Sequence, residues 1–369
     1  MKFNCKKVDL LEAVSILQKA IKNNHTVNIL DGILIQAEDK VKLTGYDLET
    51  GIESDLQSDV MEKGSVVVNS RLFGDYIKSL PDGLVTISCD DRYRVTIVTG
   101  DTKININGTS SETYPKIPVI DTNDKITISQ KVLKNMIANT IFAVSKDDTR
   151  QSLTGCCMES NGSSLVMVAI DGFRMALRRT DMGSGFPVMN FIIPGKALSE
   201  CAKIFDGDSD DKEVIVYPSS NHLLFDVGDV RIVSRLIQGP FVNYNSIIQK
   251  NPKSVMKIDR RKLLSAAERA SIAIANDERR SPVRLSNTSN PSVLTVCATT
   301  EGTNTEDAID ISMQGENIDI DFNNKYLIDA LKNIEEDNIK IEFNGSQGPC
   351  IILPEEGEQF LYLILPIRR

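Results

Sequence analysis

Apolar residues along the chain recur with two periods, one typical of α-helices and one typical of β-strands. Leu10, Val14, Leu17 and Ile21 fall on one face at helical spacing, which predicts a helix over 7–22. The same reasoning predicts further helices over 71–80, 131–141, 196–205, 260–270 and 325–333. Between the helices, stretches of alternating apolar and polar residues predict short strands. One strand precedes each predicted helix and three follow it, so the chain is built from β-α-β-β-β units.

Two marks in the sequence repeat at one spacing and indicate three copies of a single domain. The first is a turn glycine between alternating apolar residues, and its copies lie about 130 residues apart at Gly100, Gly228 and, in weaker form, Gly357. The second is a short β run, a turn and a helix opened by a cation, which recurs at a similar spacing. The periodicity lapses at the Pro-containing links 115–124 and 246–254. We therefore predict three α+β domains, over 1–120, 121–250 and 251–369, each with two β-α-β-β-β units.

The composition suits a globular protein of the cytoplasm. With 41% hydrophobic and 25% charged residues, each repeat can bury a core of its own. No apolar run approaches the ~20 residues of a membrane span, and the start of the sequence lacks the apolar region of a signal peptide. The seven cysteines are scattered without C-x-x-C spacing, so we expect reduced thiols packed as small apolar groups.

Positive charge is concentrated on the predicted helices. The chain as a whole carries a formal net charge of −9, yet every one of the predicted helices is net positive. Lys and Arg also suit any solvated helix face, so the pattern is only partial support for a shared basic surface. Cations without a base-reading motif are typical of sequence-independent attraction to the phosphates of duplex nucleic acid.

The sequence offers little for catalysis or metal binding. His25 and His222 occupy unrelated repeat positions, and no phosphate loop, H-E-x-x-H motif or Cys/His metal spacing occurs. Asp47 and Asp171 fall at matching turns of two repeats, which favours a structural role over an acid catalyst. Carboxylate clusters lie at predicted turns, where solvated loops are expected: Asp208–Asp211, Glu335–Asp337 and Glu355–Glu358. We predict no catalytic residue, no metal and no cofactor.

Several segments together carry a resemblance to a known family. Residues 169–176 read A-I-D-G-F-R-M-A, similar to a family pattern A-T-D-G-[HFY]-R-L-A, and residues 234–239 read S-R-L-I-Q-G ahead of Phe241 and Tyr244. The segments 1–3, 142–155 and 362–368 are similar to the family in the same way. With these residues the whole chain resembles the β subunit of bacterial DNA polymerase III, the sliding clamp family.

The resemblance implies a fold, an assembly and a function. Three tandem domains of the DNA-clamp fold would close as a head-to-tail homodimeric ring, with helices inside and sheets outside. Double-stranded DNA would pass through the ring without sequence preference. The protein would be a processivity factor without a catalytic site. Its partners would be the replicative polymerase, the clamp loader and repair proteins, which bind through short linear peptides, in the cytoplasm at the nucleoid and away from membranes.

The resemblance also implies a peptide pocket between the second and third domains. We expect an apolar groove with two cations, Arg174 and Arg368, at its rim, suited to an aliphatic and aromatic peptide. Position 242 is Val where the family usually has Pro, and Arg369 extends beyond the usual ending. The expected pocket residues are Leu153, Ile170, Gly172, Phe173, Arg174, Met175, Val242, Ile247, Leu363, Leu365, Pro366, Ile367 and Arg368.

Two further surfaces follow from the ring. Asn23 and Asn24 are neutral where the family often has a basic residue, which weakens one expected DNA contact. The expected DNA-facing cations are Lys19, Lys22, Arg71, Lys78, Lys131, Lys134, Lys196, Lys203, Arg260, Arg261, Arg269, Lys325 and Lys332. Ring closure is expected between the basic strand 102–107, near Arg92 and Arg94, and the acidic segment 301–311. The expected interface residues are Lys103, Ile104, Glu301, Glu306 and Asp307.

Two other classes of protein stay open at this stage. A nuclease with an acidic metal site would turn over duplex DNA in the presence of a divalent metal. A repeat scaffold that binds only proteins would show no preference for circular over linear DNA. A ring of two chains, each of 40.8 kDa, would favour the clamp.

Overall fold

The computed structural model describes all residues except 22–27, 122–124, 249–250, 276–280 and 369. Lys22, Asn23, Asn24, His25 and Arg369, which entered the sequence predictions, therefore lie outside the described residues. The chain divides into two compact units, and the border falls inside the predicted middle domain. Unit 1 comprises residues 1–134 and 196–236, and unit 2 comprises 135–195 and 237–369.

The described residues contain six α-helices, and each matches a predicted one. They are α1 (Lys7–Leu17), α2 (Ser70–Ser79), α3 (Gln130–Ala138), α4 (Gly195–Ile204), α5 (Arg260–Ile274) and α6 (Asn324–Lys332). Short polar side chains begin three of them: Asn69, Asp259 and Asn323 each accept a hydrogen bond from a backbone N–H of the first turn. Helix α1 is shorter than predicted and α5 is longer. No helix in the described ranges is long and apolar enough to cross a membrane.

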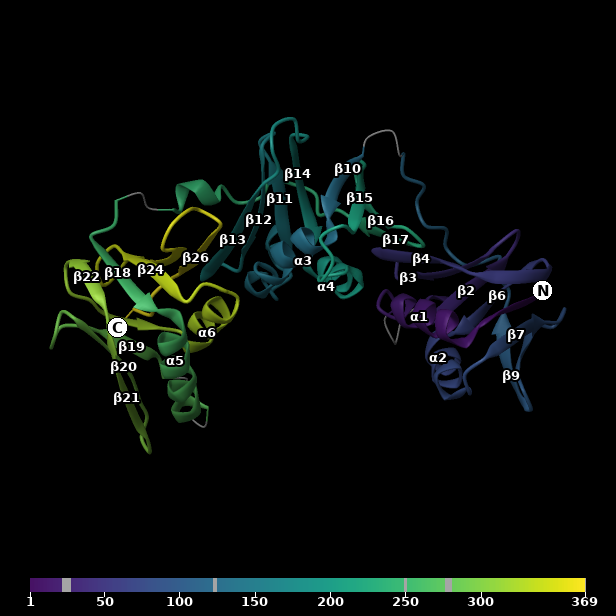
Figure 1. Cartoon of the computed structure of the whole chain (residues 1–369), viewed down its shortest axis with the longest axis horizontal. Coiled ribbons are helices and arrows are strands. Elements are labelled where there is room, and N and C mark those ends of the chain that lie inside the picture. The colour runs from purple at the N-terminus through teal and green to yellow at the C-terminus, as the bar shows by residue number, and fades with distance from the viewer. Residues whose placement is uncertain (22–27, 122–124, 249–250, 276–280, 369) are drawn as a thin grey trace. The chain divides into compact units, whose positions relative to one another are not determined.

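Unit 1 is built on one 13-stranded sheet (Figure 1), with the strand order β10-β15-β16-β17-β4-β3-β2-β6-β9-β8-β7-β1-β5. Helices α1 and α2 pack against each other, and α1 also packs on β3 and β4. The strands are β1 (Lys2–Lys6), β2 (Gly32–Ala37), β3 (Val41–Tyr46), β4 (Thr50–Leu56), β5 (Ser58–Glu62), β6 (Gly64–Asn69), β7 (Leu84–Cys89), β8 (Arg94–Thr99), β9 (Thr102–Thr109), β10 (Ile126–Ser129), β15 (Glu213–Pro218), β16 (His222–Val227) and β17 (Val230–Arg235).

Unit 2 has two sheets, one in the order β14-β11-β12-β13-β26-β25-β24-β18-β22 and one in the order β21-β20-β19-β23. Helices α5 and α6 pack against each other, and α5 covers β20 and β21. The strands are β11 (Gly155–Ser160), β12 (Ser164–Ile170), β13 (Arg174–Asp181), β14 (Met189–Pro194), β18 (Ser254–Asp259), β19 (Val283–Ser286), β20 (Val293–Thr299), β21 (Asn304–Asp310), β22 (Ser312–Gly315), β23 (Asp319–Phe322), β24 (Asn338–Phe343), β25 (Cys350–Pro354) and β26 (Phe360–Ile364).

The predicted order of β-α-β-β-β units is confirmed. Gly100, Gly228 and Gly357, which mark the repeat, all take left-handed backbone angles in the turn before the last strand of each domain, with φ of 51°, 78° and 86°. Strands β5 and β22 were not predicted. Each adds a short edge strand beside β1 or β18, and their sequences, SDVME and SMQG, have too few apolar residues to show alternation.

One pairing rule joins consecutive domains. The last strand of a domain's first β-α-β-β-β unit pairs antiparallel with the last strand of the next domain: β4 with β17, and β13 with β26. Two such strands have no partner under this rule. They are β9, the last strand of the first domain, and β21, the last strand of the first unit in the third domain. Among the described residues, β21 pairs only with β20, and the 102–107 part of β9 pairs only with β8. The rule therefore leaves one open strand edge at each end of the series of domains.

Candidate functional site

An apolar cluster lies on one face of β12, β13, β25 and β26 in unit 2. Alternate residues of these strands point to the same face, as the pleat of a sheet requires. Tyr244 completes the cluster, and its hydroxyl donates a hydrogen bond to Glu159. Burial, with a smaller effect of Glu159, raises the pKa of Tyr244. The cluster, called the Leu363 cluster below, consists of Leu153, Val166, Val168, Ile170, Met175, Leu177, Tyr244, Ile351 and Leu363.

The Leu363 cluster contains four of the predicted pocket residues and several that the sequence analysis missed. Leu153, Ile170, Met175 and Leu363 are buried in it, and Ile247 packs against it. Val166, Val168, Leu177 and Ile351 follow the same two-residue alternation, so the strand pattern could have found these four. Further missed residues pack over the cluster while partly exposed: Phe241, Ile248, Leu353 and Leu361. The cluster itself is therefore buried, and the apolar side chains that cover it are partly exposed.

The C-terminal segment after β26 leaves several apolar side chains partly exposed. Leu365 is 38% exposed and Ile367 is 42% exposed. Strand β26 ends at Ile364, because Pro366 lacks the N–H that a ladder needs. The backbone is held instead by two single hydrogen bonds, from Leu365 N to Phe173 O at 2.9 Å and from Ile367 N to Asp321 O at 2.8 Å.

The β12–β13 turn beside this segment is shaped by Asp171. Its Oδ1 accepts hydrogen bonds from the backbone N–H groups of Phe173 at 2.9 Å and Arg174 at 3.0 Å. Gly172 takes the left-handed conformation with φ of 95°, and Phe173 is 62% exposed. The β3–β4 turn of unit 1 is built alike, since Asp47 Oδ1 accepts from Glu49 N and Thr50 N. The predicted structural role of both aspartates is confirmed.

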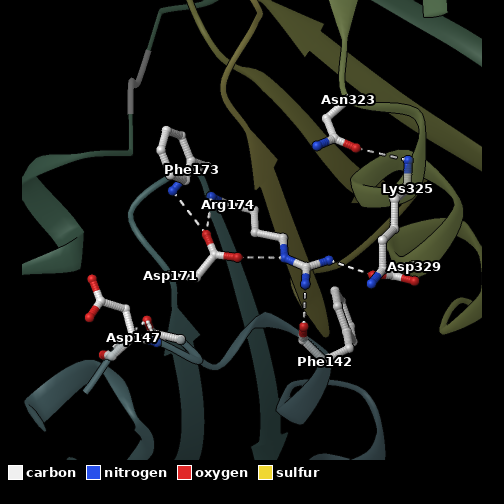
Figure 2. Close-up of polar contacts among 9 residues, drawn as sticks. Phe142, Asp147, Asp171, Phe173, Arg174, Asn323, Lys325 and Asp329 are labelled. Atoms are coloured by element: carbon white, nitrogen blue, oxygen red, sulfur yellow. Dashed lines mark hydrogen bonds and ion pairs between the residues drawn. The ribbon is translucent and has the colours of Figure 1, made fainter. Parts of the chain in front are cut away.

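Arg174 does not lie at a rim, so this prediction is wrong. Its side chain is only 10% exposed, and the guanidinium donates to Asp171 Oδ2 at 2.9 Å, Asp329 Oδ2 at 2.7 Å and Phe142 O at 2.6 Å (Figure 2). It also lies over the ring of Tyr326, 4.4 Å from the centroid. Buried acceptors within the chain use its charge. Arg174 therefore fixes the β12–β13 turn to helix α6, while Arg368 is exposed.

The corresponding strand junction in unit 1 is covered by Ile117 at the position that matches Met175. A Cβ added at Gly51 would lie only 2.5 Å from Ile117 Cδ1, so Ile117 fills the space that the side chain of Met175 occupies at the matching register position. The side chain of Lys196 lies 2.7 Å from the fully buried carboxylate of Asp47. Burial alone would raise the pKa of Asp47, but the hydrogen bonds from Lys196 and the backbone hold it below its usual value.

Some of the predicted DNA-facing cations are used within the chain. Lys19 follows the end of α1 and donates to Lys203 O at 3.2 Å. Arg260 donates to Glu336 O at 2.7 Å and to Leu331 O at 3.3 Å, which ties α5 to the end of α6. Together with Lys196 they are structural ties, because their donors are directed at protein acceptors. Their contact with DNA stays a prediction.

The remaining helix cations differ in their partners, and all of them except the half-buried Lys134 are exposed. Lys134 donates to Phe205 O at 2.9 Å. Carboxylates of the same chain pair with Lys131, Lys203, Arg261, Arg269 and Lys332. In the described part of the chain, no side-chain partner is seen for Arg71, Lys78 and Lys325.

Asp307, a predicted interface residue, already has a partner within the chain. Asp307 forms a two-oxygen ion pair with Arg269, with distances down to 2.6 Å, so it is less available for a second chain than expected. Lys103 and Glu306 are exposed on the open edges of β9 and β21, and Ile104 is partly exposed. The sequence analysis missed Ile272 of α5, which is 75% exposed.

Comparison with known proteins gives a single result along the whole chain. Family models for the N-terminal, central and C-terminal domains of the DNA polymerase III β subunit match residues 1–118, 127–243 and 245–368. The β sliding clamp of Staphylococcus epidermidis is 35% identical and that of Staphylococcus aureus is 34% identical, each over 100% of this chain and 99% of the relative.

Solved structures agree with the sequence comparisons. The DNA polymerase sliding clamp of Bacillus subtilis is 33% identical, with a TM-score of 0.95 over 100% of this chain and 99% of that one. The β subunit from the DNA polymerase of Streptococcus pyogenes is 26% identical, with a TM-score of 0.93 over 100% of both chains. The chain therefore belongs to the DNA polymerase III β-subunit family, the DNA sliding clamps, which are processivity factors and not enzymes.

Proposed function

We propose that two copies of this chain close head to tail into a ring around duplex DNA, and that the ring tethers the replicative polymerase, the clamp loader and repair proteins through short peptides. The observation that carries the proposal is the strand-pairing rule, which leaves one open edge on β9 and one on β21. Two chains related head to tail pair both of these edges at once, so neither of them stays open to aggregation. Such a clamp would work in the cytoplasm, at the nucleoid.

The register of the existing junctions gives the register of the proposed one. At β17–β4, Arg231 is opposite Glu53 and Ile232 is opposite Ile52. Equivalent positions on β9 and β21 place Lys103 of one copy opposite Glu306 of the other, and Ile104 opposite Thr305. Opposite charges therefore face each other again, which supports this pairing over a shifted one.

A helix contact supports the same junction. In unit 2, Phe142 follows α3 and packs edge-on against Tyr362 of β26, with ring centroids 5.5 Å apart. Counted from the start of each domain's first helix, Ile272 occupies the position of Phe142, and Ile104 occupies that of Tyr362 on the last strand. Ile272 is largely exposed in the single chain. Contact with Ile104 of a second copy would bury both side chains, and helix α5 would then lie beside β9 of its neighbour.

The peptide site is proposed at the Leu363 cluster. The cluster has an apolar floor, and the exposed Phe173, Leu365 and Ile367 lie on the two segments joined by the Leu365–Phe173 hydrogen bond. Such a surface suits a short peptide that presents Leu and Phe side chains. The matching surface in unit 1 is filled by Ile117, so each chain offers one site of this kind.

Encirclement, rather than tight contact, should hold the clamp on DNA. The protein should be loaded by the host's clamp loader on a nicked DNA circle, challenged with high salt, and then the circle should be cut once. Phosphate contacts are screened by salt, whereas a closed ring is not. We expect the protein to remain on the circle at high salt and to be lost after linearisation. Equal retention on circular and linear DNA would contradict a ring.

Reversal of one charge tests the register at ring closure. Glu306→Lys should raise the dimer dissociation constant by about tenfold, because each cross-strand charge pair contributes about 0.2–1 kcal/mol and a ring contains two junctions. Lys103→Glu combined with Glu306→Lys should restore the original constant, measured by sedimentation at low concentration. Asp310 is another exposed residue of β21, so Asp310→Lys serves as the control for added charge. If the double variant dimerises no more tightly than Glu306→Lys alone, Lys103 and Glu306 do not meet at the junction.

A further inference from the structure

Most exposed cations on the helices are paired with carboxylates of their own unit. In unit 1, Lys131 Nζ lies 2.7 Å from Asp210 and Lys203 Nζ lies 2.9 Å from Glu200. In unit 2, Arg261 lies 2.8 Å from Asp337, Arg269 lies 2.6 Å from Asp307 and Lys332 lies 3.0 Å from Glu268. The pairs are distributed over α3, α4, α5 and α6, the helices that the proposed function places toward DNA.

The exposure of these pairs decides how they behave toward phosphate. The side chains of Lys131 and Asp210 are 46% and 80% exposed, and those of Arg261 and Asp337 are 72% and 64% exposed. Exposed pairs are weak, because water and salt screen them, so a phosphate can displace the carboxylate. The displaced carboxylate stays attached beside the phosphate, and the two negative groups repel each other. Each such contact with DNA is therefore weaker than a contact made by an unpaired cation.

We propose that Asp210, Glu268 and Asp337 compete with DNA phosphates for the helix cations, which lowers the affinity of the ring for the DNA backbone and keeps its movement along the duplex fast. This inference rests on the proposed encirclement of DNA. Three reasons single out these carboxylates as the competitors to test. Their partners lie on different helices, their side chains are all at least 47% exposed, and none is on the strand edges proposed for ring closure. Asp307 is left out because it lies on β21.

The competition makes a specific prediction about salt. The logarithm of affinity for duplex DNA falls with the logarithm of salt concentration, by about 0.9 for each phosphate that a cation neutralises. Removal of a competing carboxylate frees its cation for phosphate, so the slope should become steeper. A change in bulk charge alone would act at any position on the surface, and matched variants can separate the two effects.

The test compares two triple variants of the full-length protein. Asp210→Asn, Glu268→Gln and Asp337→Asn remove the competitors, and Asp91→Asn, Asp229→Asn and Glu356→Gln remove the same charge from exposed strand turns. Affinity for a short linear duplex is measured by fluorescence anisotropy over a range of salt. At low salt we expect the first variant to bind at least tenfold more tightly than the unchanged protein, with a steeper slope. The control should change by less than threefold.

The diffusion of loaded clamps gives an independent measurement. On a long DNA circle, the first variant should diffuse at least twofold more slowly than the control. Equal DNA affinity, equal salt slope and equal diffusion for the two variants would overturn the proposal. If a triple variant does not fold, the same measurements are made on the single variant Asp210→Asn, which lies in an exposed loop. If the unchanged protein is not retained on circular DNA, the ring itself is wrong. If it is retained but the variants behave alike, only this inference fails.

Discussion

Replacement of Ile272 with Asp should convert the dimer into monomers at concentrations where the unchanged protein is dimeric. Ile272 is 75% exposed in the single chain and would be buried against Ile104 of the second copy. Burial of one such side chain contributes about 1.5–3 kcal/mol, and a ring loses this twice. The dimer dissociation constant should therefore rise at least about a hundredfold, since 1.4 kcal/mol corresponds to about tenfold. Sedimentation equilibrium measures the change.

A matched control separates interface loss from a general effect of added charge. Val188→Asp places the same carboxylate on a residue that is 79% exposed, in the loop between β13 and β14. It should leave the dimer unchanged. Val188→Asp should melt at the temperature of the unchanged protein, and Ile272→Asp should stay folded as a monomer, because neither side chain is part of a core within the chain. A dimer that survives Ile272→Asp would show that α5 is not at the closing junction.

Removal of residues 365–369 should abolish peptide binding and leave the dimer intact. The deletion removes the partly exposed side chains of Leu365 and Ile367 and the hydrogen bond to Phe173. Two covered apolar side chains contribute about 1.5–3 kcal/mol each, so the affinity should fall at least about a hundredfold. Calorimetry with a short peptide that contains Leu and Phe measures this fall.

Point variants guard against a purely structural effect of the deletion. Leu365→Ala with Ile367→Ala keeps the backbone and should show most of the loss, whereas Val119→Ala removes a fully exposed apolar side chain of unit 1 and should bind normally. Sedimentation should show a dimer for all three proteins, because the proposed closing edges are on β9 and β21. Equal peptide affinity for the truncated and intact chains would show that the C-terminal segment is not part of the site.

The fold was predictable because patterns within short stretches of sequence determine its helices, strands and turns. The helices and the turn glycines Gly100, Gly228 and Gly357 depend on spacing within a few residues, and the repeat supplied each signal three times. The misses have local reasons too. Strands β5 and β22 carry almost no apolar alternation, and they form because β1 and β18 offer an open edge. Helix α5 was predicted to end at Ala270, but it continues to Ile274, and Ala273 extends its buried face by one more turn.

The candidate site was less predictable, because charge pairing depends on residues far apart in the sequence. Arg174 meets Asp329, which is 155 residues away, and Lys196 meets Asp47, which is 149 residues away. The sequence shows a cation in each case but not the acceptor that uses it. The ion pair of Asp307 was missed for the same reason, since Arg269 lies on another element. Ile272 carried a usable signal, because alignment of the repeats sets it against Phe142.

A covalently closed ring tests the central claim most directly. The register places Asn105 of β9 opposite Asn304 of β21 in the second copy, as Val233 is opposite Gly51 and Leu363 opposite Met175 within the chain. Asn105→Cys and Asn304→Cys should be made together, with Ser at the half-buried Cys89 and Cys297.

The loaded protein is then joined on a nicked DNA circle with a short bis-maleimide and denatured in detergent. We predict that the joined dimer stays on the circle after denaturation and leaves when the circle is cut, because only a topological link survives unfolding. If no joined dimer forms, or if it leaves the intact circle on denaturation, the chain does not close around DNA at these strands.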